Sequence, residues 1–245
     1  SSRPYHRPCS TRVISTTAKT TSALRARPFL GAASVVALFV ALWMALVWSP
    51  PDAAMGNVVR ILYVHVANAW LAYLAFVVVF LASVAYLWTK RPVFDAIAVA
   101  SAEIGVLFTG LTLVLGAIWA RPTWGVWWSW EPRVITTAVM FAMYIGYLLL
   151  RNLSDDLERR ATRAAVLGIV LVVDVPIVHL SVTWMNALHQ LPSVLRPGLD
   201  PTLDPSMLAS LIAMTIAFTF LYAYLMTARV DIERRRQSRI LEARA

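Results

Sequence analysis

Residues 61–88 read ILYVHVANAWLAYLAFVVVFLASVAYLW and contain no Asp, Glu, Lys or Arg. A helix of about 20 apolar residues crosses the hydrocarbon core of a bilayer, so this run is long enough to cross it with a tilt. Its apolar residues do not alternate with polar ones, which favours a helix over a strand of a membrane barrel. The run therefore predicts one transmembrane helix.

Five further runs of spanning length are uncharged or nearly so. They cover residues 29–48, 96–119, 134–150, 164–182 and 206–228. The whole chain is 59% hydrophobic and only 14% charged, with a mean hydropathy of +0.66, which is more apolar side chain than a soluble core of this length can bury. We therefore expect an all-α integral membrane protein built as a bundle of six transmembrane helices.

The Lys and Arg residues predict how this bundle is oriented in the membrane. Of the 22, all but four lie in the two terminal tails and in the second and fourth connections between spans. The exceptions are Arg60, Arg121, Arg133 and Arg196. Because cytoplasmic segments carry the excess of Lys and Arg, we expect both termini to be cytoplasmic and the other three connections to lie outside. The same bias, together with anionic lipid, explains the net charge of +9 without a nucleic-acid partner.

Three regions are expected along the chain. Residues 1–28 are rich in Ser, Thr and Arg and lack acids, which predicts a disordered basic cytoplasmic tail, although they also resemble an organelle presequence. Residues 29–228 are expected to form the six-span domain, with a tryptophan-rich outer loop at 119–133. Residues 229–245 predict a charged helical extension of the last span on the cytoplasmic side, solvated or lying on lipid headgroups.

Two sequence motifs are absent, and their absence excludes some functions. Cys9 is the only cysteine, so the chain has no intramolecular disulfide and no Cys-x-x-Cys-His haem attachment site. It also lacks a Gly-x-x-x-x-Gly-Lys-[Ser/Thr] phosphate loop, so any dependence on ATP requires a partner chain. The protein is therefore not itself a c-type cytochrome.

The segment Trp124-Gly-Val-Trp127-Trp128-Ser-Trp130-Glu-Pro-Arg133 joins two of the predicted spans on the outer side. A lone Trp at a helix end is typical of the aromatic belt at a membrane surface. Four indoles beside a Gly that permits close approach, ended by Glu-Pro-Arg, instead favour a flat apolar ligand at that surface.

Two histidines are expected on the same side of the membrane. His65 lies about one turn inside the outer end of the second span, on the order of 6 Å along the helix from Ile61, and His189 follows the fifth span. A single His near a helix end is more often a hydrogen-bonded or interfacial residue. Two neutral imidazoles from different segments, however, could occupy both axial positions of a haem iron.

Three sequence blocks carry a family resemblance. The tryptophan-rich segment is preceded by Arg60-Ile-Leu-Tyr-Val-His65-Val and followed by Pro176-Ile-Val-His179-Leu-Ser-Val-Thr-Trp184, with Leu188-His189-Gln190 shortly after. In this order and spacing, over roughly residues 29–228, they resemble the CcmC family of cytochrome c maturation proteins. The tryptophan-rich segment alone is shared with a broader superfamily of WWD-type haem-handling proteins.

The resemblance implies a function and a set of partners. Members of this family bind haem b at the outer membrane face through two axial histidines, which match His65 and His189. The tryptophan-rich segment, here Trp124, Trp127, Trp128 and Trp130, forms a platform under the porphyrin. The family delivers haem to the chaperone CcmE, with the ABC-type subunits CcmA and CcmB and the small membrane protein CcmD as further partners. This implies a lyase-like delivery factor without independent turnover, in a bacterial inner (plasma) membrane or an organelle inner membrane.

The chemistry of haem agrees with these assignments. Its two propionates require cations, which Arg60 and Arg133 can supply, with Arg121 as a weaker third candidate. Glu131, also counted among the cofactor-binding residues, stands where the family usually has Asp. It keeps the charge but reaches one methylene further, so any hydrogen bond made there must shift.

Two acids lie inside predicted spans. An ionised carboxylate is costly in lipid, so Glu103 and Asp174 should face the bundle or be protonated. His179, about one turn from Asp174, is a candidate partner for it rather than a haem ligand. Pro176 removes a backbone hydrogen bond there and predicts a kink.

Two other functions compete with haem delivery. A permease that conducts haem or another substrate should have broken helices or a polar path through the middle of the membrane. A synthetase that attaches haem to the apocytochrome normally requires a longer chain with more histidines. From the sequence we favour the delivery factor.

Overall fold

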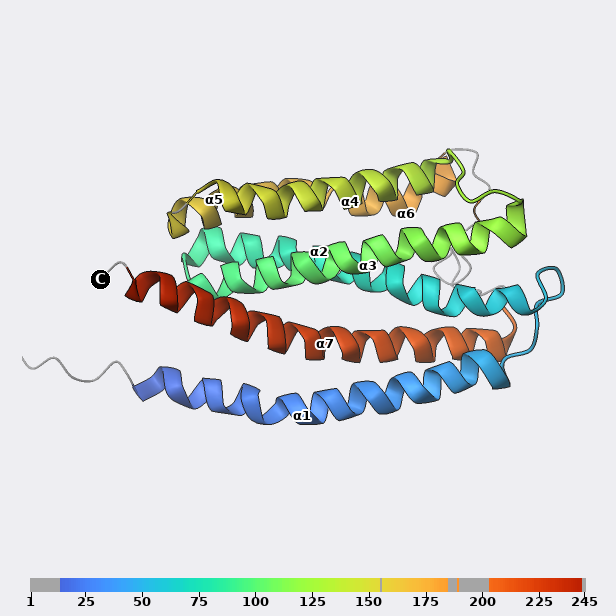
Figure 1. Ribbon diagram of the computed structural model, residues 1–245, viewed down its shortest axis with the longest axis horizontal. Helices are drawn as coiled ribbons and strands as arrows, with labels where there is room; N and C mark the ends of the chain where they lie inside the picture. The colour runs from blue at the N-terminus through green and yellow to red at the C-terminus, as the bar shows by residue number, and fades with distance from the viewer. Residues whose placement is uncertain (1–13, 155, 185–188, 190–202, 244–245) are drawn as a thin grey trace, which may run out of the picture.

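The structure is a computed structural model that describes residues 14–154, 156–184, 189 and 203–243. The described residues are almost entirely helical and contain no β-strand (Figure 1). The long helices are α1 (Ile14–Trp43), α2 (Arg60–Thr89), α3 (Pro92–Trp124), α4 (Pro132–Leu150), α5 (Leu157–Leu171), α6 (Asp174–Trp184) and α7 (Pro205–Glu242). A π-helical turn, Met44–Trp48, continues α1, and 3-10 turns at Asn57–Val59 and Arg151–Leu153 precede α2 and follow α4.

Six segments are long and apolar enough to cross a membrane, which confirms the predicted all-α membrane fold. Five of them centre on α1, α2, α3, α4 and α7, and the sixth combines α5 and α6. All six run longer than the apolar runs of the sequence, because residues beyond the ends of those runs continue the helices.

The helices lie roughly side by side in layers (Figure 1). The α2–α3 pair forms the middle of the bundle, α4 with α5 and α6 covers one side, and α7 followed by α1 covers the other. The described ends of the chain lie at one end of the bundle, called here the termini end. The link from α3 to α4, which contains the tryptophan-rich segment, lies at the opposite end, called here the tryptophan end.

Prolines and a glycine set the helix boundaries near the tryptophan end. Pro132 and Pro205 stand at the first turns of α4 and α7, where a missing N–H costs nothing. Gly125 ends α3 with a φ of 77°, a left-handed conformation that strains any residue with a Cβ. The chain therefore leaves α3 abruptly, just after Trp124.

The fifth span is interrupted near Pro176, where the sequence predicts a kink. α5 ends at Leu171 and α6 begins at Asp174, with Val172 and Val173 between them. The ring of a proline clashes with the carbonyl four residues before it, and for Pro176 that residue is Val172. The break therefore stands where the proline forbids a continuous helix.

The N-terminal side of the described chain is more helical than the sequence predicted, whereas the C-terminal extension is helical as predicted. α1 begins at Ile14, inside the segment 1–28 for which a disordered tail is expected, and residues 1–13 lie outside the described part. That segment has no Gly or Pro between Ile14 and Arg27, so nothing in it stops a helix from extending. α7 continues unbroken through the 229–245 extension as far as Glu242.

This extension of α7 packs against the bundle through a buried polar network. Arg151 donates two hydrogen bonds to the Asp95 carboxylate, at 2.7 and 2.8 Å, and both side chains are only 6% exposed. Gln237 donates to the same carboxylate at 3.0 Å, and Glu233 pairs with Arg160 at 3.5 Å. The network ties α3, α5 and α7 together at the termini end.

Candidate functional site

The tryptophan-rich segment forms the surface of the tryptophan end. The indoles of Trp128 and Trp130 meet edge to face, with ring centroids 5.8 Å apart. Trp127, Trp128 and Trp130 are exposed by 61%, 39% and 82%, respectively. Trp124, at the end of α3, is less exposed than these three and contacts a histidine. The segment thus divides into three outward indoles and one that takes part in a cluster of polar residues.

His189 is held in this cluster by two residues of the segment. The Glu131 carboxylate accepts a hydrogen bond from the backbone N–H of His189 at 3.0 Å and a second one from its imidazole Nδ1. The Trp124 ring stands edge-on to the imidazole, with centroids 5.1 Å apart. A carboxylate only accepts hydrogen bonds, so Nδ1 carries the hydrogen and Nε2 keeps a free lone pair.

Burial acts on the charge of the same imidazole. It lowers the pKa of His189 from its ordinary value of 6.5, although the Glu131 carboxylate pulls the pKa the other way. Arg133 acts with burial, because its charge repels a protonated imidazole. Burial and Arg133 therefore favour the neutral ring, which is the form that coordinates a metal.

His65 approaches from α2 and rests on α3. A Cβ added to Gly116 would lie only 3.1 Å from Cε1 of His65, so the glycine makes room for the imidazole. The Trp119 indole lies on the same side, with ring centroids 5.7 Å apart and an interplanar angle of 57°. Nδ1 of His65 and Nε1 of Trp119 are both buried without a hydrogen-bond partner among the described residues.

Arg133 links the two histidines. It stands in the first turn of α4 and interacts electrostatically with both imidazoles, which also interact with each other. Its Nη2 donates a hydrogen bond to the backbone carbonyl of His179 at 3.0 Å. Glu131 and Trp124 therefore contact His189 and form a cluster with it, while Arg133 and His65 lie near enough to this cluster for their charges to interact with His189, without a described contact between the two histidines.

Several donors near this end have no partner within the described part of the chain. The Nε atoms of Arg60 and Arg133 and the Oγ of Ser129 are buried and make no hydrogen bond. Leaving a buried donor unpaired costs about 1–3 kcal/mol, and more when it is charged. Two guanidinium N–H groups and one imidazole nitrogen, Nδ1 of His65, are therefore unpaired at this end, and these are groups that bind anions and metals.

Other predicted residues take different partners. His179 contacts the ring of Tyr73 edge-on at 6.4 Å, and no described contact joins it to Asp174. Arg121 donates to the carbonyl of Gly125, so it closes the turn after α3. Glu103 is paired with Arg229 of α7, which neutralises its charge. The described ring contacts of Trp127, Trp128 and Trp130 do not include either histidine of the cluster.

Two residues that contact His65 were missed in the sequence. Gly116 and Trp119 lie three residues apart on α3, so they share the helix face that receives His65. The only signal for them is this spacing, which an apolar span offers at many places. Sequence analysis therefore counted them as ordinary residues of the third span.

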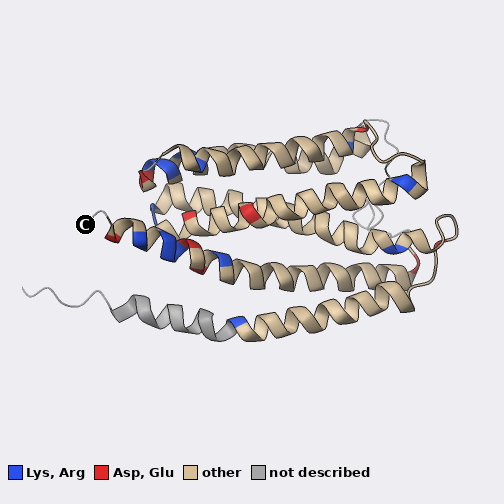
Figure 2. Cartoon of the chain, viewed as in Figure 1, with Lys and Arg blue, Asp and Glu red and all other residues tan. Residues whose placement is uncertain are grey.

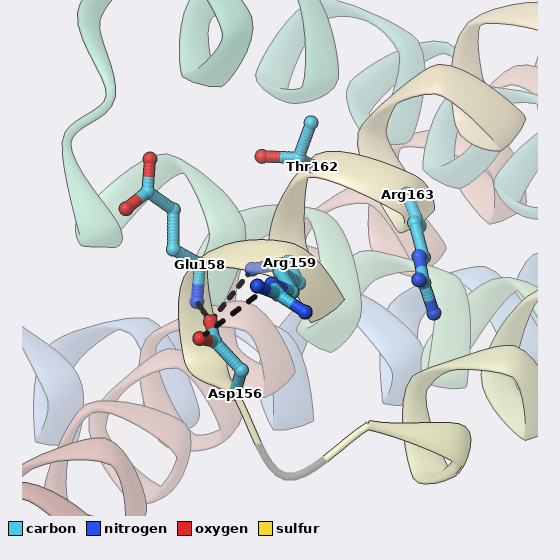
Figure 3. A pocket seen from close by; sticks show the side chains of 5 residues that line it. All are labelled: Asp156, Glu158, Arg159, Thr162 and Arg163. Carbon is cyan, nitrogen blue, oxygen red and sulfur yellow. Dashed lines mark hydrogen bonds and ion pairs between the residues drawn. The ribbon is translucent and has the colours of Figure 1, made fainter.

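A pocket at the start of α5 is a separate feature of the termini end. It is lined by Asp156, Glu158, Arg159, Thr162 and Arg163 (Figure 3). Asp156 accepts hydrogen bonds from the backbone N–H groups of Glu158 and Arg159, at 2.9 Å each, and so caps the helix. Asp156 therefore serves the local helix structure. The side chains that line the pocket carry charges of both signs, so the lining favours neither anions nor cations.

The six apolar spans, with a cluster of imidazole, guanidinium and indole side chains at one end, define a helical membrane protein with a polar site at the end of its bundle. The sequence model of the CcmC family, described as Heme exporter protein C, matches residues 10–243. The chain belongs to this family.

Individual relatives agree with this assignment. A Heme exporter protein C of Bradyrhizobium diazoefficiens is 40% identical over 174 residues, which are 71% of this chain and 66% of that protein. One of Haemophilus influenzae is 38% identical, covering 69% of each chain. A cytochrome c biosynthesis ccmC-like mitochondrial protein of Marchantia polymorpha is 34% identical, covering 67% of this chain and 68% of its own length.

Proposed function

We propose that this protein binds haem b at the tryptophan end of its bundle and delivers it to the haem chaperone CcmE during cytochrome c biogenesis. The observation that carries the proposal is the contact of the Glu131 carboxylate with Nδ1 of His189, which leaves Nε2 to bind a metal, together with the unpaired and buried Nδ1 of His65, whose charge interacts with that of His189. The names of the relatives, heme exporter and cytochrome c biosynthesis proteins, support the same role.

Each group of residues has a distinct task in this proposal. His65 and His189 are the axial ligands of the haem iron. Arg60 and Arg133, whose Nε atoms are buried and unpaired, hold the two propionates. Bound haem supplies an iron that accepts two imidazoles and a flat apolar ring. The protein supplies the fixed imidazoles, the cations and the indoles that cover the ring.

The exposed indoles fit a role in handing haem over. Trp127 and Trp130 remain 61% and 82% exposed, although indole is among the more costly side chains to leave in water. At the surface beside the cluster they offer a platform for the porphyrin and a contact area for the chaperone. The protein then acts as a delivery factor without a catalytic turnover of its own.

Orientation follows the charge distribution in this proposal. Lys and Arg gather at the termini end of the bundle and are few at the tryptophan end (Figure 2). The termini end therefore faces the cytoplasm, and the haem site faces the outside. The membrane is a bacterial inner membrane or the inner membrane of an organelle, since the relatives include bacterial and mitochondrial proteins.

The partners follow from the family rather than from a described contact. CcmA and CcmB supply the ATP-dependent step for which this sequence has no phosphate loop, and CcmD stabilises the assembly. CcmE receives the haem at the tryptophan end. The proposal is tested by co-expressing the protein with CcmE and staining denaturing gels for covalently bound haem. The adduct is expected with the wild type and absent with a His65→Ala, His189→Ala double variant; adduct formed equally by both would overturn the delivery role.

One observation favours the competing permease. The fifth span is broken at Val172–Val173, and the nearby hydroxyls of Tyr144 and Tyr147 and the Asp174 Oδ2 are buried without partners in the described structure. Broken helices with polar groups line the substrate paths of many transporters. Against this, Tyr144 stacks on Phe76 with centroids 3.6 Å apart, and both are fully buried, so aromatic rings fill this part of the core.

Proteoliposomes separate the two functions. A permease loads haem into sealed vesicles that contain only this protein, and Asp174→Asn reduces that uptake. A delivery factor leaves the lumen free of haem while the outer site is loaded. Uptake above that of protein-free vesicles would favour the permease.

A further inference from the structure

We infer that Glu131 is a positioning residue that fixes the tautomer and orientation of His189 and thereby tunes the haem iron, rather than a residue that binds haem. The inference rests on the proposed haem-binding function and deepens it. It replaces the simpler expectation, drawn from the sequence, that Glu131 contacts the cofactor directly.

The contacts of Glu131 are all directed at one residue. One carboxylate oxygen accepts the backbone N–H of His189 at 3.0 Å, and the other accepts Nδ1 of the same residue. The Glu131 side chain is only 5% exposed, so water does not compete for it. A carboxylate that accepts hydrogen bonds from both the backbone and the ring of one histidine fixes the orientation of that ring.

Glu131 stands at a helix N-terminus, where a carboxylate commonly caps the helix. Glu131 is the N-cap residue of α4, yet its side chain makes no capping hydrogen bond to that helix. Asp156 and Asp204 occupy the corresponding positions before α5 and α7, and their carboxylates do cap their helices. The carboxylate of Glu131 is therefore not explained by local helix stability.

Charge also argues against direct contact with haem. The propionates are anionic, and a buried carboxylate beside them would repel them. Hydrogen-bonded to Nδ1–H, the same carboxylate makes the imidazole a stronger electron donor through Nε2, as outer partners of metal-bound histidines commonly do. Glu131 thus acts on the iron through His189.

Two substitutions of Glu131 separate the effect of its charge from the effect of its length. Glu131→Gln keeps the size but removes the charge, and one end of its amide can only donate, so it cannot accept both hydrogen bonds. Glu131→Asp keeps the charge with one methylene less, and it is the residue that the family resemblance implies here. Glu103→Gln is the control, because Glu103 pairs with Arg229 on the termini side of the site.

The first measurement is the reduction midpoint potential of haem bound to the purified full-length protein. A stronger donor stabilises ferric iron, so Glu131→Gln is expected to retain haem but to raise the equilibrium constant for reduction about tenfold, or about 59 mV for one electron. Glu131→Asp should lie close to the wild type, and Glu103→Gln should match it.

A double variant tests whether Glu131 acts through His189. Where His189→Ala has removed the ligand, adding Glu131→Gln should leave the potential unchanged. An equal shift with and without His189 would mean that Glu131 contacts haem itself, and no shift in the single variant would mean that it does not tune the iron. Either result overturns the inference.

A second readout does not require haem. Nitrogen chemical shifts of histidine-labelled protein, with the His189 signals assigned from His189→Ala, report which ring nitrogen carries the hydrogen. Nδ1–H is expected in the wild type, and a mixture or Nε2–H in Glu131→Gln. If the wild type retains no haem, the proposed function fails, while these shifts still decide whether Glu131 fixes the tautomer; identical shifts in both proteins would refute it.

Discussion

The imidazole of His65 lies directly over Gly116 of α3, where a Cβ would approach its Cε1 to 3.1 Å. No side chain fits between them unless the histidine moves. The glycine therefore controls the position of one of the two proposed iron ligands, although it is not a ligand itself.

Gly116→Val should displace His65 and weaken haem binding about tenfold, or about 1.4 kcal/mol. Gly110 is a matched control on the same helix, because a Cβ there would lie 3.2 Å from the ring of Phe141, away from the histidines. Both valines overpack the bundle and should cost about 1–3 kcal/mol of stability. Haem titration of the two variants checks this, and equal affinities would show that Gly116 does not position His65.

Replacing the histidines one at a time should rank them. His65→Ala and His189→Ala should each reduce haem affinity by at least about tenfold, since even outer partners of metal ligands have effects of this size. His179→Ala should change it little, because that ring contacts Tyr73. Added imidazole should restore the six-coordinate spectrum of the first two variants. Equal loss in all three would contradict the assignment.

The two arginines near the site should differ in their effect. Arg133 interacts with both histidines and has an unpaired Nε, whereas Arg121 holds the turn carbonyl of Gly125. A hydrogen bond to a charged group is worth about 1.5–3 kcal/mol, so Arg133→Gln should weaken haem binding roughly tenfold or more. Arg121→Gln should bind haem like the wild type. Titration with a haem whose propionates are esterified should abolish the difference between wild type and Arg133→Gln.

The buried pair at the termini end should contribute to stability without affecting the site. Arg151→Ala leaves the Asp95 carboxylate buried and without its bidentate partner, which typically costs about 3–5 kcal/mol. Asp95→Asn combined with Arg151→Met removes both charges and should cost less. Thermal unfolding in detergent measures the loss of stability in the two variants. The haem affinity of both, measured below their unfolding temperatures, should equal that of the wild type.

Binding and delivery should separate at the exposed indoles. Replacing Trp127 and Trp128 by Ala should leave the two histidines able to hold some haem, while the covalent adduct with CcmE is lost because the contact surface is gone. Phe at both positions keeps flat apolar rings and should restore part of the transfer. Delivery at the wild-type rate by the Ala variant would make these residues a membrane belt only.

The sequence predicted those parts of the fold that depend on composition and spacing. Six apolar runs of spanning length became six spans, because lipid leaves a polypeptide few alternatives to a helix. The interruption at Val172 and Val173 lies where Pro176 predicts a kink, because the proline removes a backbone hydrogen bond there.

The sequence predicted which residues form the candidate site but not which of them contact one another. His65 and His189 could be chosen from the sequence, whereas the contact between Glu131 and His189 joins two residues that lie 58 positions apart in the chain. Gly116 and Trp119 were missed for the same reason, since only the packing of α2 on α3 gives them a role. The spacing of residues within one segment does not predict contacts between segments that are distant in the sequence.

The central claim is that His65 and His189 together bind haem iron, and the absorption spectrum of the purified, detergent-solubilised protein tests it most directly. The wild type is expected to show a six-coordinate, bis-imidazole spectrum with bound or added haem. The His65→Ala, His189→Ala double variant should lack this spectrum. A wild-type protein that stays colourless and takes up no added haem, or a double variant with an unchanged spectrum, would contradict the claim.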